Sequence, residues 1–327
     1  MKKFIFCQVV LLLILSCKKE GGITGLPQLS TLTITDITAI TGNTATVSGS
    51  VVDEGESAVT VYGACWSTSA SPTITSDTTA QTPVGLAFTA LLHDLDPGTV
   101  YHVRLYATNL QGTAYSNEVT FTTSTFGSVT DIDGNIYRTV RIGTQIWMAD
   151  NLKTSRLNNA GFMPNKTDNS QWANMTTAAY CYHNNDAANN TIYGKLYNWY
   201  AVATGKLAPQ GWHVPDSTEL RTLIDFVGGE SVAGGALKTT DLWNSPNTGA
   251  TNSSNFNWYP AGSRYGLLGS ALDGNFVNFG GNAFAWSSTS VSSTSATSYN
   301  LGSYNKTMIL KLSTIKSSGQ SVRCIKD

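Results

Sequence analysis

Charge is scarce in this chain of 327 residues. Asp, Glu, Lys and Arg together make up 13% of it, and the formal net charge is −1. Proteins that bind nucleic acid carry a basic stripe or patch, and many peripheral membrane proteins carry a polybasic segment. The composition therefore argues against a nucleic-acid-binding protein and against a polybasic membrane-binding segment. We expect no nucleic-acid partner.

Histidine is also rare, with four in the chain. His183 and His213 are the two in the C-terminal part, and neither belongs to a His-x-x-x-His or His-Glu pairing of the kind that holds zinc. No Gly-x-Ser-x-Gly nucleophile elbow and no phosphate-binding loop occur. We therefore expect no catalytic residues, no metal and no cofactor. His213, between a Trp and a Pro, is interpreted as a hydrogen-bonded structural imidazole.

The apolar stretch at residues 4–14 is too short to span a bilayer, which takes about 20 residues. It follows Lys2 and Lys3 and precedes Leu15-Ser16-Cys17, the layout of a secretory signal. The cysteine resembles that of a bacterial lipobox, so residues 1–17 are predicted to be a lipoprotein signal with Cys17 lipidated. The alternative is an ordinary secretory signal with a chance cysteine. Lys18-Lys19-Glu20 is similar to Bacteroidetes surface-export tags, which implies a Gram-negative outer-membrane or cell-surface lipoprotein with the membrane as partner.

Residues 18–30 are rich in Gly, Lys and Thr and are predicted to be a tether. Residues 31–124 then show strand-like runs about every ten residues, separated by turn residues, as in an all-β sandwich. The runs are 31–37, 44–52, 59–67, 87–92, 100–108 and 114–123. Within 100–108, the alternation predicts inward side chains at Tyr101, Val103, Leu105 and Ala107, and outward ones at His102, Arg104, Tyr106 and Thr108.

The turn Leu95-Asp96-Pro97-Gly98-Thr99-Val100-Tyr101 resembles the one before strand F of fibronectin type III domains. In that family a tyrosine hydroxyl ties back to the backbone as a tyrosine corner. The resemblance implies a fibronectin type III or immunoglobulin-like module, with Cys65 and Trp66 in its core. Such modules are usually spacers.

A second domain is expected at residues 126–327, after a small-residue stretch that few contacts should cross. It opens with Asp131-Ile132-Asp133-Gly134-Asn135, which we interpret as a hairpin turn; a calcium loop is the alternative, but its spacing is wrong. Asp216 and Glu219 are typical of a helix cap and first turn, and a helix with an apolar face follows them to Gly228. A second helix is predicted at residues 196–203, ending before Gly205.

Four further motifs carry a resemblance to a known family. Together they resemble the Fibrobacter succinogenes major paralogous domain, found in surface and secreted lipoproteins. Their order is also similar to that of formylglycine-generating enzymes, which implies an α+β domain with a C-type lectin-like fold. The motifs are Gln145-Ile146-Trp147-Met148-Ala149-Asp150-Asn151-Leu152, Gly211-Trp212-His213-Val214-Pro215, Trp286-Ser287-Ser288-Thr289 and Ser321-Val322-Arg323-Cys324-Ile325-Lys326-Asp327.

Three cysteines remain outside the predicted signal and lipobox. An odd number in an oxidising compartment leaves one pair and one free thiol. We predict a disulfide between Cys181 and Cys324, with Cys65 free. The resemblance to formylglycine-generating enzymes implies one alternative, a copper-dependent oxidase in which thiolates hold the metal.

Aromatic side chains are concentrated in the loop-rich region of residues 243–305. Aromatic faces beside Asn and Ser donors suit sugars and protein epitopes alike. Most of these rings also have a packing explanation, so we expect exposure chiefly at Arg264, Tyr265 and Tyr299. The sequence thus predicts a lipid-anchored surface protein whose lectin-like head binds an extracellular glycan or protein. The alternative is a structural surface protein without a small ligand.

Overall fold

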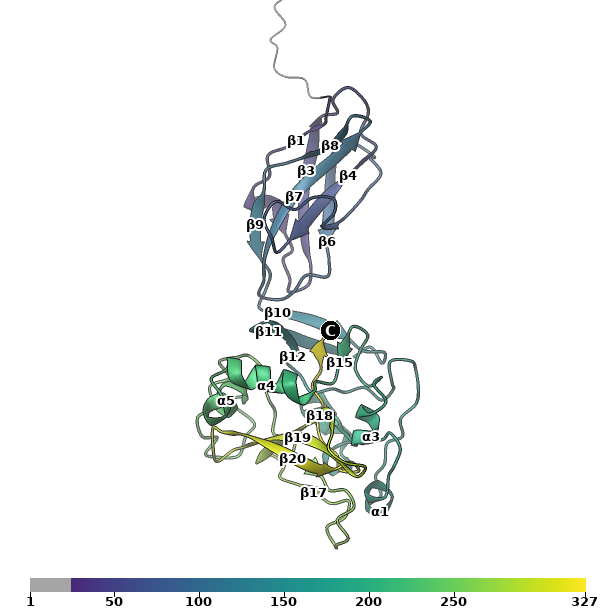
Figure 1. The fold of residues 1–327 in the computed structure, drawn as a ribbon, viewed down its shortest axis with the longest axis vertical. Coiled ribbons are helices and arrows are strands. Elements are labelled where there is room, and N and C mark those ends of the chain that lie inside the picture. The colour runs from purple at the N-terminus through teal and green to yellow at the C-terminus, as the bar shows by residue number, and fades with distance from the viewer. Residues whose placement is uncertain (1–24) are drawn as a thin grey trace, which may run out of the picture.

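The computed structural model describes residues 25–327. The predicted signal, the lipobox Cys17 and most of the tether lie outside this range. Within it, no helix is long and apolar enough to cross a membrane. Figure 1 shows a β-sandwich above a second, larger body, with the C-terminal end of the chain close to where the two meet.

The N-terminal body is a sandwich of two sheets of antiparallel strands. One sheet holds β1 (Gln28–Leu29), β2 (Ile37–Thr38), β3 (Ala45–Asp53) and β6 (Ala87–Leu92). The other sheet holds β4 (Val61–Ser67), β5 (Asp77–Thr78), β7 (Val100–Asn109), β8 (Gly112–Tyr115) and β9 (Val119–Thr122). In the first sheet, a short 3-10 helix, η1 (Ile34–Asp36), comes directly before β2. The predicted sandwich is therefore present.

The tyrosine corner forms as the turn sequence predicts. The hydroxyl oxygen of Tyr101 accepts a hydrogen bond from the backbone N–H of Asp96 at 3.0 Å. Cys65 and Trp66 are buried, as are the four residues expected to face inward. Tyr106 was expected to face outward, and that prediction is wrong: its ring covers Gly63, and its hydroxyl donates to the Thr79 carbonyl at 2.8 Å. The segment after β5 folds over this face of the sheet and buries the ring.

The chain enters and leaves the sandwich at opposite ends. Gly25 lies against the β7–β8 hairpin, where its carbonyl accepts from the Asn109 amide at 2.7 Å. The exit, after β9, lies beside the turns that hold Asn43 and Asp96. Figure 1 shows this exit at the end of the sandwich that meets the second body. This geometry suits a spacer that holds the second body away from its point of attachment, and we call the two bodies the stalk and the head.

The head begins with a hairpin of β10 (Phe126–Thr130) and β11 (Ile136–Ile142). Gly134, in the turn between them, has φ +82°, so the hairpin interpretation of the Asp131–Asn135 segment is confirmed. The sheet continues through β12 (Gln145–Met148), β21 (Ile325–Lys326) and β15 (Trp212–His213). This pairing brings the C-terminal strand beside the junction with the stalk.

The helix predicted after Pro215 is α4 (Ser217–Phe226), and it carries the expected capping box of Asp216 and Glu219. The helix predicted at 196–203 is wrong in its first half. Residues 196–197 form β14 (Leu196–Tyr197), and only α3 (Trp199–Val202) is helical, because Asn198 caps it by accepting from the Ala201 N–H. The sequence did not predict α5 (Glu230–Leu237), in which Gly234 lets the Lys306 carbonyl approach closely.

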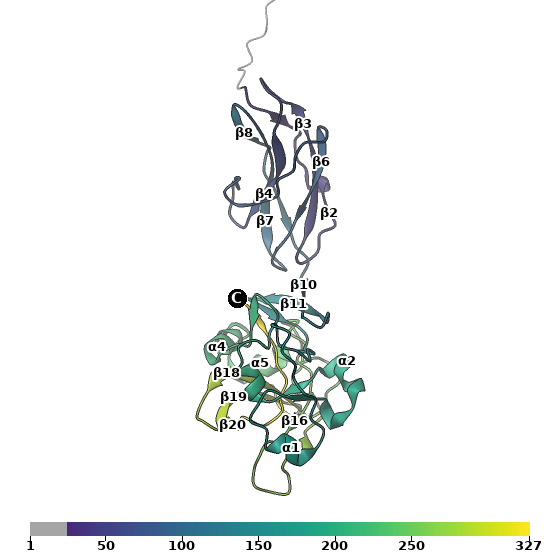
Figure 2. The same ribbon diagram turned by 90° about the vertical axis from the view of Figure 1, so that its right-hand side faces the viewer.

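The rest of the head is short strands and loops (Figure 2). A three-stranded sheet, β18 (Asn282–Ser290), β19 (Ser295–Gly302) and β20 (Met308–Ile315), lies beside α4 and α5. Two small hairpins pair β13 (Tyr180–Cys181) with β14 and β16 (Ser263–Arg264) with β17 (Phe276–Val277). Short helical turns complete it: α1 (Asn169–Ala173), η2 (His183–Asn185), η3 (Ala187–Asn189) and α2 (Asn190–Tyr193). The head is thus an α+β domain, and its likeness to C-type lectins stays a prediction.

Candidate functional site

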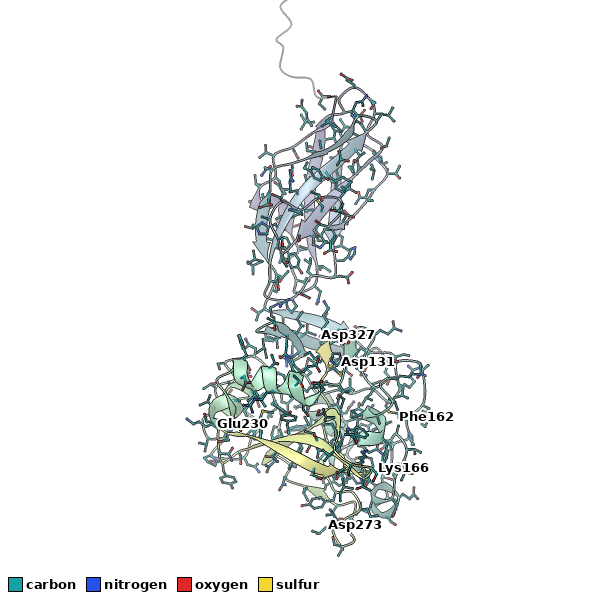
Figure 3. All side chains as sticks on the ribbon, viewed as in Figure 1. Asp131, Phe162, Lys166, Glu230, Asp273 and Asp327 are labelled. Carbon is teal, nitrogen blue, oxygen red and sulfur yellow. The ribbon has the colours of Figure 1, made fainter. Side chains whose placement is uncertain are left out.

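Arg264, predicted to be exposed, is fully buried, with 0% of its surface accessible. Its guanidinium donates to the backbone carbonyls of Gly274, Lys166 and Thr167 and to the side chain of Asn169, all at 2.6–2.9 Å. The prediction of a ligand contact is therefore wrong. Arg264 instead ties together the loops at the end of the head that is farthest from the stalk, near Lys166 and Asp273 (Figure 3).

Tyr299 is also buried, with 1% exposure, and its hydroxyl donates to the Ser217 carbonyl at 3.2 Å. The prediction that it is exposed is wrong, because it lies on the face of β19 that packs on α4. Tyr265 is half-buried beside Arg264. The three residues predicted to bind ligand therefore do not form one site.

The predicted disulfide between Cys181 and Cys324 is absent, and Cys65, Cys181 and Cys324 are all free and buried. Cys181 packs in a small cluster with Trp172 and Leu196, whereas Cys324 belongs to a different core cluster. Burial raises the pKa of the Cys181 thiol to about 12 and also raises the pKa of Cys324. The two sulfur atoms lie in separate apolar clusters, so the structure does not bring them together as a pair of ligands for one metal ion.

Buried cations hold much of the loop-rich head together. Lys238, with 0% exposure, donates from Nζ to the carbonyls of Thr248, Gly302 and Asn305 at 2.9–3.2 Å. Arg323 donates to the carbonyls of Phe256 and Asn257. Neither forms an ion pair among the residues described. Irregular backbone leaves carbonyls unpaired, and these side chains supply the missing donors.

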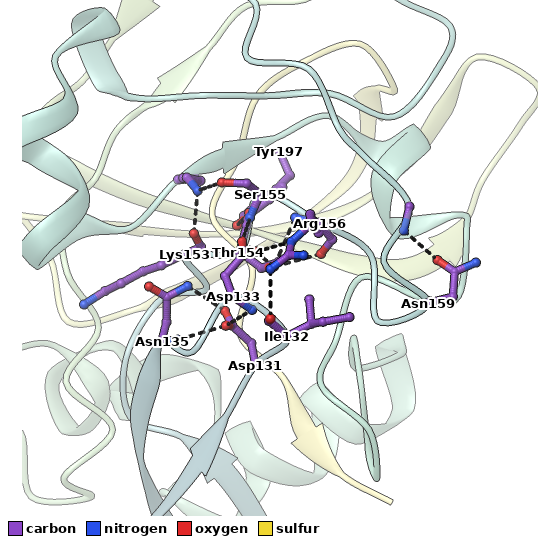
Figure 4. Close-up of polar contacts among 12 residues, drawn as sticks. Asp131, Ile132, Asp133, Asn135, Lys153, Thr154, Ser155, Arg156, Asn159 and Tyr197 are labelled. Atoms are coloured by element: carbon purple, nitrogen blue, oxygen red, sulfur yellow. Dashed lines mark hydrogen bonds and ion pairs between the residues drawn. The ribbon is translucent and has the colours of Figure 1, made fainter.

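The acidic turn at the start of the head is satisfied by its own surroundings (Figure 4). Asp131 accepts from the N–H groups of Asp133 and Asn135 and from the Tyr137 hydroxyl. Asp133 accepts from the Ser155 N–H and pairs with Arg156. Every carboxylate here has donors from the protein, and no group of His, Cys, Asp and Glu suited to a metal occurs in residues 25–327. The turn is a structural clasp between the first hairpin and the segment after β12.

His213 has the structural role that the sequence predicts. Its Nε2 lies 2.7 Å from Glu219 and its Nδ1 lies 2.6 Å from Asp327. Burial lowers the pKa of the imidazole, but the hydrogen bonds and charges of the two carboxylates outweigh burial and raise it overall. The contact fastens the last strand to the start of α4, on the side of the head that faces the stalk (Figure 3).

A pocket of about 500 Å³ opens where the head meets the stalk, and we call it the junction pocket. That volume lies within the range of small-ligand sites, about 300–1,000 Å³. Val140 and Ile142 of β11 are its buried apolar residues. Its polar residues are Thr125, Arg141, Ser253, Ser254 and Asn255, and the remainder are Phe226, Val227, Gly228 and Ala236.

An exposed aromatic ring stands at the mouth of this pocket. Phe226, the last residue of α4, is 64% exposed. It packs against the tight turn at Gly143, where φ is +62° and a Cβ would come within 2.8 Å of the ring. The Asn255 side chain makes no hydrogen bond within the described part of the chain, so its amide is free for a ligand. An apolar floor, an open ring and a rim of amide and hydroxyl groups are features of sugar and peptide sites.

Arg141 joins the head to the stalk. Its Nη2 donates to Asp96 of the stalk at 2.6 Å, and its Nε donates to the Thr99 hydroxyl at 2.9 Å. Lys326, in the C-terminal strand, pairs with the other oxygen of Asp96 at 2.7 Å. Asn43 also accepts from the Ser128 N–H. More contacts therefore cross the junction than its small, polar sequence predicts.

One feature of the sequence points to this pocket. The apolar face of α4 consists of Leu220, Leu223 and Ile224, and Phe226 falls off that face. An aromatic residue on the polar side of an amphipathic helix is a candidate for binding. Apart from Val227 and Gly228, the other lining residues come from four separate segments, and only the fold brings them together.

Residues 140–326 match the family described as the Fibrobacter succinogenes major domain. A comparison with curated proteins gave no match. Among solved structures, the sensor domain of the anti-sigma factor RsgI4 in Pseudobacteroides cellulosolvens is similar at 16% identity and a TM-score of 0.24, over 30% of this chain and 76% of that one. The chicken CNTN1 FN1-FN3 domains are similar at 18% identity and a TM-score of 0.23, over 30% of each chain. The fibronectin type III domain of human fibronectin type III domain containing protein 3 is similar at 19% identity and a TM-score of 0.21. That match covers 30% of this chain and 84% of the other.

The family match covers the head from β11 to the last strand, which is more than half of the chain. It includes three of the four motifs that suggested the family from the sequence, and all of the fourth except its last residue, Asp327. The chain therefore belongs to the Fibrobacter succinogenes major domain family, with a β-sandwich that carries a tyrosine corner in front of the family domain.

Proposed function

We propose that this protein is a lipid-anchored surface protein whose head binds an extracellular glycan or protein ligand at the junction pocket, without catalysis. Family membership suggests a surface-type binding domain. The observation that carries the proposal is the exposed Phe226 ring above an apolar floor with a polar rim. A C-type lectin-like head would agree with this role, since that fold includes many binders of sugars and proteins.

The stalk supports the proposal through its geometry. The chain enters at one end and leaves at the other, so the head stands clear of the end that holds residue 25 (Figure 1). A lipid on Cys17 would then leave the head free to meet large ligands. Replacement of Cys17 by Ala should abolish palmitate labelling and membrane association, and labelling that persists would refute the anchor.

Binding should be tested with the full chain displayed as a multimer on glycan and extracellular-matrix arrays. A single ring with a few hydrogen bonds gives weak monovalent affinity, which multivalent display raises. Phe226→Ala should remove the signal. The matched control is Phe162→Ala, because Phe162 is 78% exposed on the flank of the head and does not line the pocket (Figure 3).

Two outcomes would overturn the proposal. Equal loss of signal in both variants would show that the pocket has no special role. A signal absent from every array would instead favour a structural surface protein. Melting temperatures within experimental error of the parent chain would show that lost binding is not lost folding.

A further inference from the structure

A second cavity lies between the stalk and the head, and we call it the stalk–head cleft. Its volume is about 200 Å³. Residues 94–97 of the stalk form one wall, and Thr139, Ile146 and Trp212 of the head belong to the other. Sites for drug-sized ligands have volumes of about 300–1,000 Å³, so this cleft has room for one small molecule.

The cleft and the floor of the junction pocket lie on opposite faces of the sheet that opens the head. Side chains alternate between the two faces along a strand, so Thr139 of β11 points away from its neighbour Val140, which lines the junction pocket. Trp212 pairs directly with Lys326, whose ammonium reaches Asp96 of the stalk. Cross-strand partners lie on the same face, so the indole is on the stalk side. The two cavities are therefore separate sites.

One buried polar group in the cleft has no partner in the protein. Thr139 is 0% exposed, and its hydroxyl makes no hydrogen bond to any described residue. The hydroxyl is directed toward the stalk, because a Cβ atom on Gly127 would come within 2.7 Å of it and within 2.5 Å of the Asn43 side chain. Burying a hydroxyl without a partner is unfavourable, so a ligand that pairs with it would stabilise the protein.

The charged residues that line the cleft already have partners. Asp96 pairs with Lys326 at 2.7 Å and with Arg141 at 2.6 Å. Asp94 lies 2.8 Å from His93, and its side chain is 92% exposed, so its carboxylate stays in water. No further acid or base lines the cleft among the described residues. An ionic ligand would therefore have to displace one of these partners.

The hydrogen-bonding groups left unused in the cleft are neutral. Besides the Thr139 hydroxyl, they are the Ser128 hydroxyl and the indole N–H of Trp212, neither of which bonds within the described part of the chain. Leu95 and Ile146 add buried apolar surface. Such a lining suits a small ring that carries hydroxyl groups and apolar C–H faces. We propose that the stalk–head cleft binds one uncharged sugar residue, which contacts both domains and so fixes the head relative to the stalk.

The test uses the full chain labelled with nitrogen-15, titrated separately with glucose, galactose, mannose and N-acetylglucosamine while the indole N–H resonances are recorded. The Trp212 resonance, assigned as the one missing from Trp212→Phe, should shift and saturate with at least one of these sugars at millimolar concentration. Thr139→Val keeps the shape of the side chain and removes its hydroxyl, so it should weaken that binding by about ten-fold, the value of one lost hydrogen bond. The matched control is Thr120→Val, because Thr120 is exposed on β9 and does not line the cleft.

Thr139→Val should melt no earlier than the parent chain, since its hydroxyl has no partner among the described residues to lose, and this separates lost binding from lost folding. A Trp212 resonance that none of the sugars moves would refute the cleft as a sugar site and leave it to water. Equal affinity in the parent chain and Thr139→Val would also refute it. Binding lost in Phe226→Ala but kept in Thr139→Val would assign the sugar to the junction pocket instead.

Discussion

Lys238 offers the sharpest test of how the head is held together. Its ammonium is fully buried and donates to three backbone carbonyls from two separate loops. Lys238→Met keeps most of the chain length of the side chain and removes every donor. Three buried carbonyls would then be left unpaired, each at about 1–3 kcal/mol.

Part of that cost is offset, because an isolated ammonium is itself expensive to bury and methionine is not. We therefore expect a net loss of about 3 kcal/mol in the free energy of unfolding of the head. For a domain of this size the melting temperature should fall by about 6–12 °C. Lys206→Met is the matched control, because the Lys206 side chain is exposed and makes no hydrogen bond within the described residues.

Urea and thermal unfolding would measure both variants. A Lys238→Met protein within about 1 kcal/mol of the parent would refute the reasoning, since that is the net value of one ordinary hydrogen bond. The pH dependence of the free energy of unfolding provides a second test. Burial lowers the pKa of Lys238 to about 8 from 10.5, so between these values the unfolded chain binds a proton that the folded chain does not. The contribution of Lys238 to stability should therefore rise with pH across this window, and the rise should be missing in Lys238→Met.

Two other predictions concern the histidines and cysteines of the head. Burial lowers the pKa of His183 to about 4 from 6.5, so stability should fall as pH drops through this window, and His183→Phe should flatten that part of a melting profile. The pKa of His213 is raised, so its contribution should be complete below pH 6.5 and fade as pH rises through the folded value; unchanged profiles in His213→Gln would contradict this. Alkylation of the unreduced protein should leave Cys65, Cys181 and Cys324 unmodified when folded and label all three when denatured, and a linked Cys181–Cys324 peptide would contradict the structure.

Local patterns were the ones that the sequence could predict. The tyrosine corner joins residues five positions apart, and the capping box of α4 spans three. The hairpin at Gly134 is likewise set by a few neighbouring residues. Each of these depends on hydrogen bonds that short peptides already favour, so no knowledge of distant segments was needed.

Exposure of single side chains in the loop-rich region could not be predicted in this way. Arg264 meets Lys166 and Thr167 from 98 and 97 residues away, and Lys238 meets Asn305 from 67 residues away. A basic side chain in a polar loop is normally exposed. Here the unpaired carbonyls of other loops reverse that preference, and they appear only once the chain has folded.

The disulfide prediction failed for a related reason. A disulfide predicted from the number of cysteines assumes that the folded chain brings two thiols into contact. Cys181 and Cys324 are instead enclosed by different groups of apolar residues. Whether the number of cysteines is odd or even says nothing about which apolar cluster each cysteine joins. Burial, rather than oxidation, accounts for Cys181 and Cys324 in this fold.

The junction between stalk and head also changes how the stalk should be regarded. A spacer contributes only length, but Asp96 of this stalk pairs with both Arg141 and Lys326 of the head. The position of the head relative to the stalk therefore depends on ionic contacts as well as on the chain that links them. For this reason the binding experiments use the complete chain, and Asp96 is the residue that best reports whether stalk and head act as one unit.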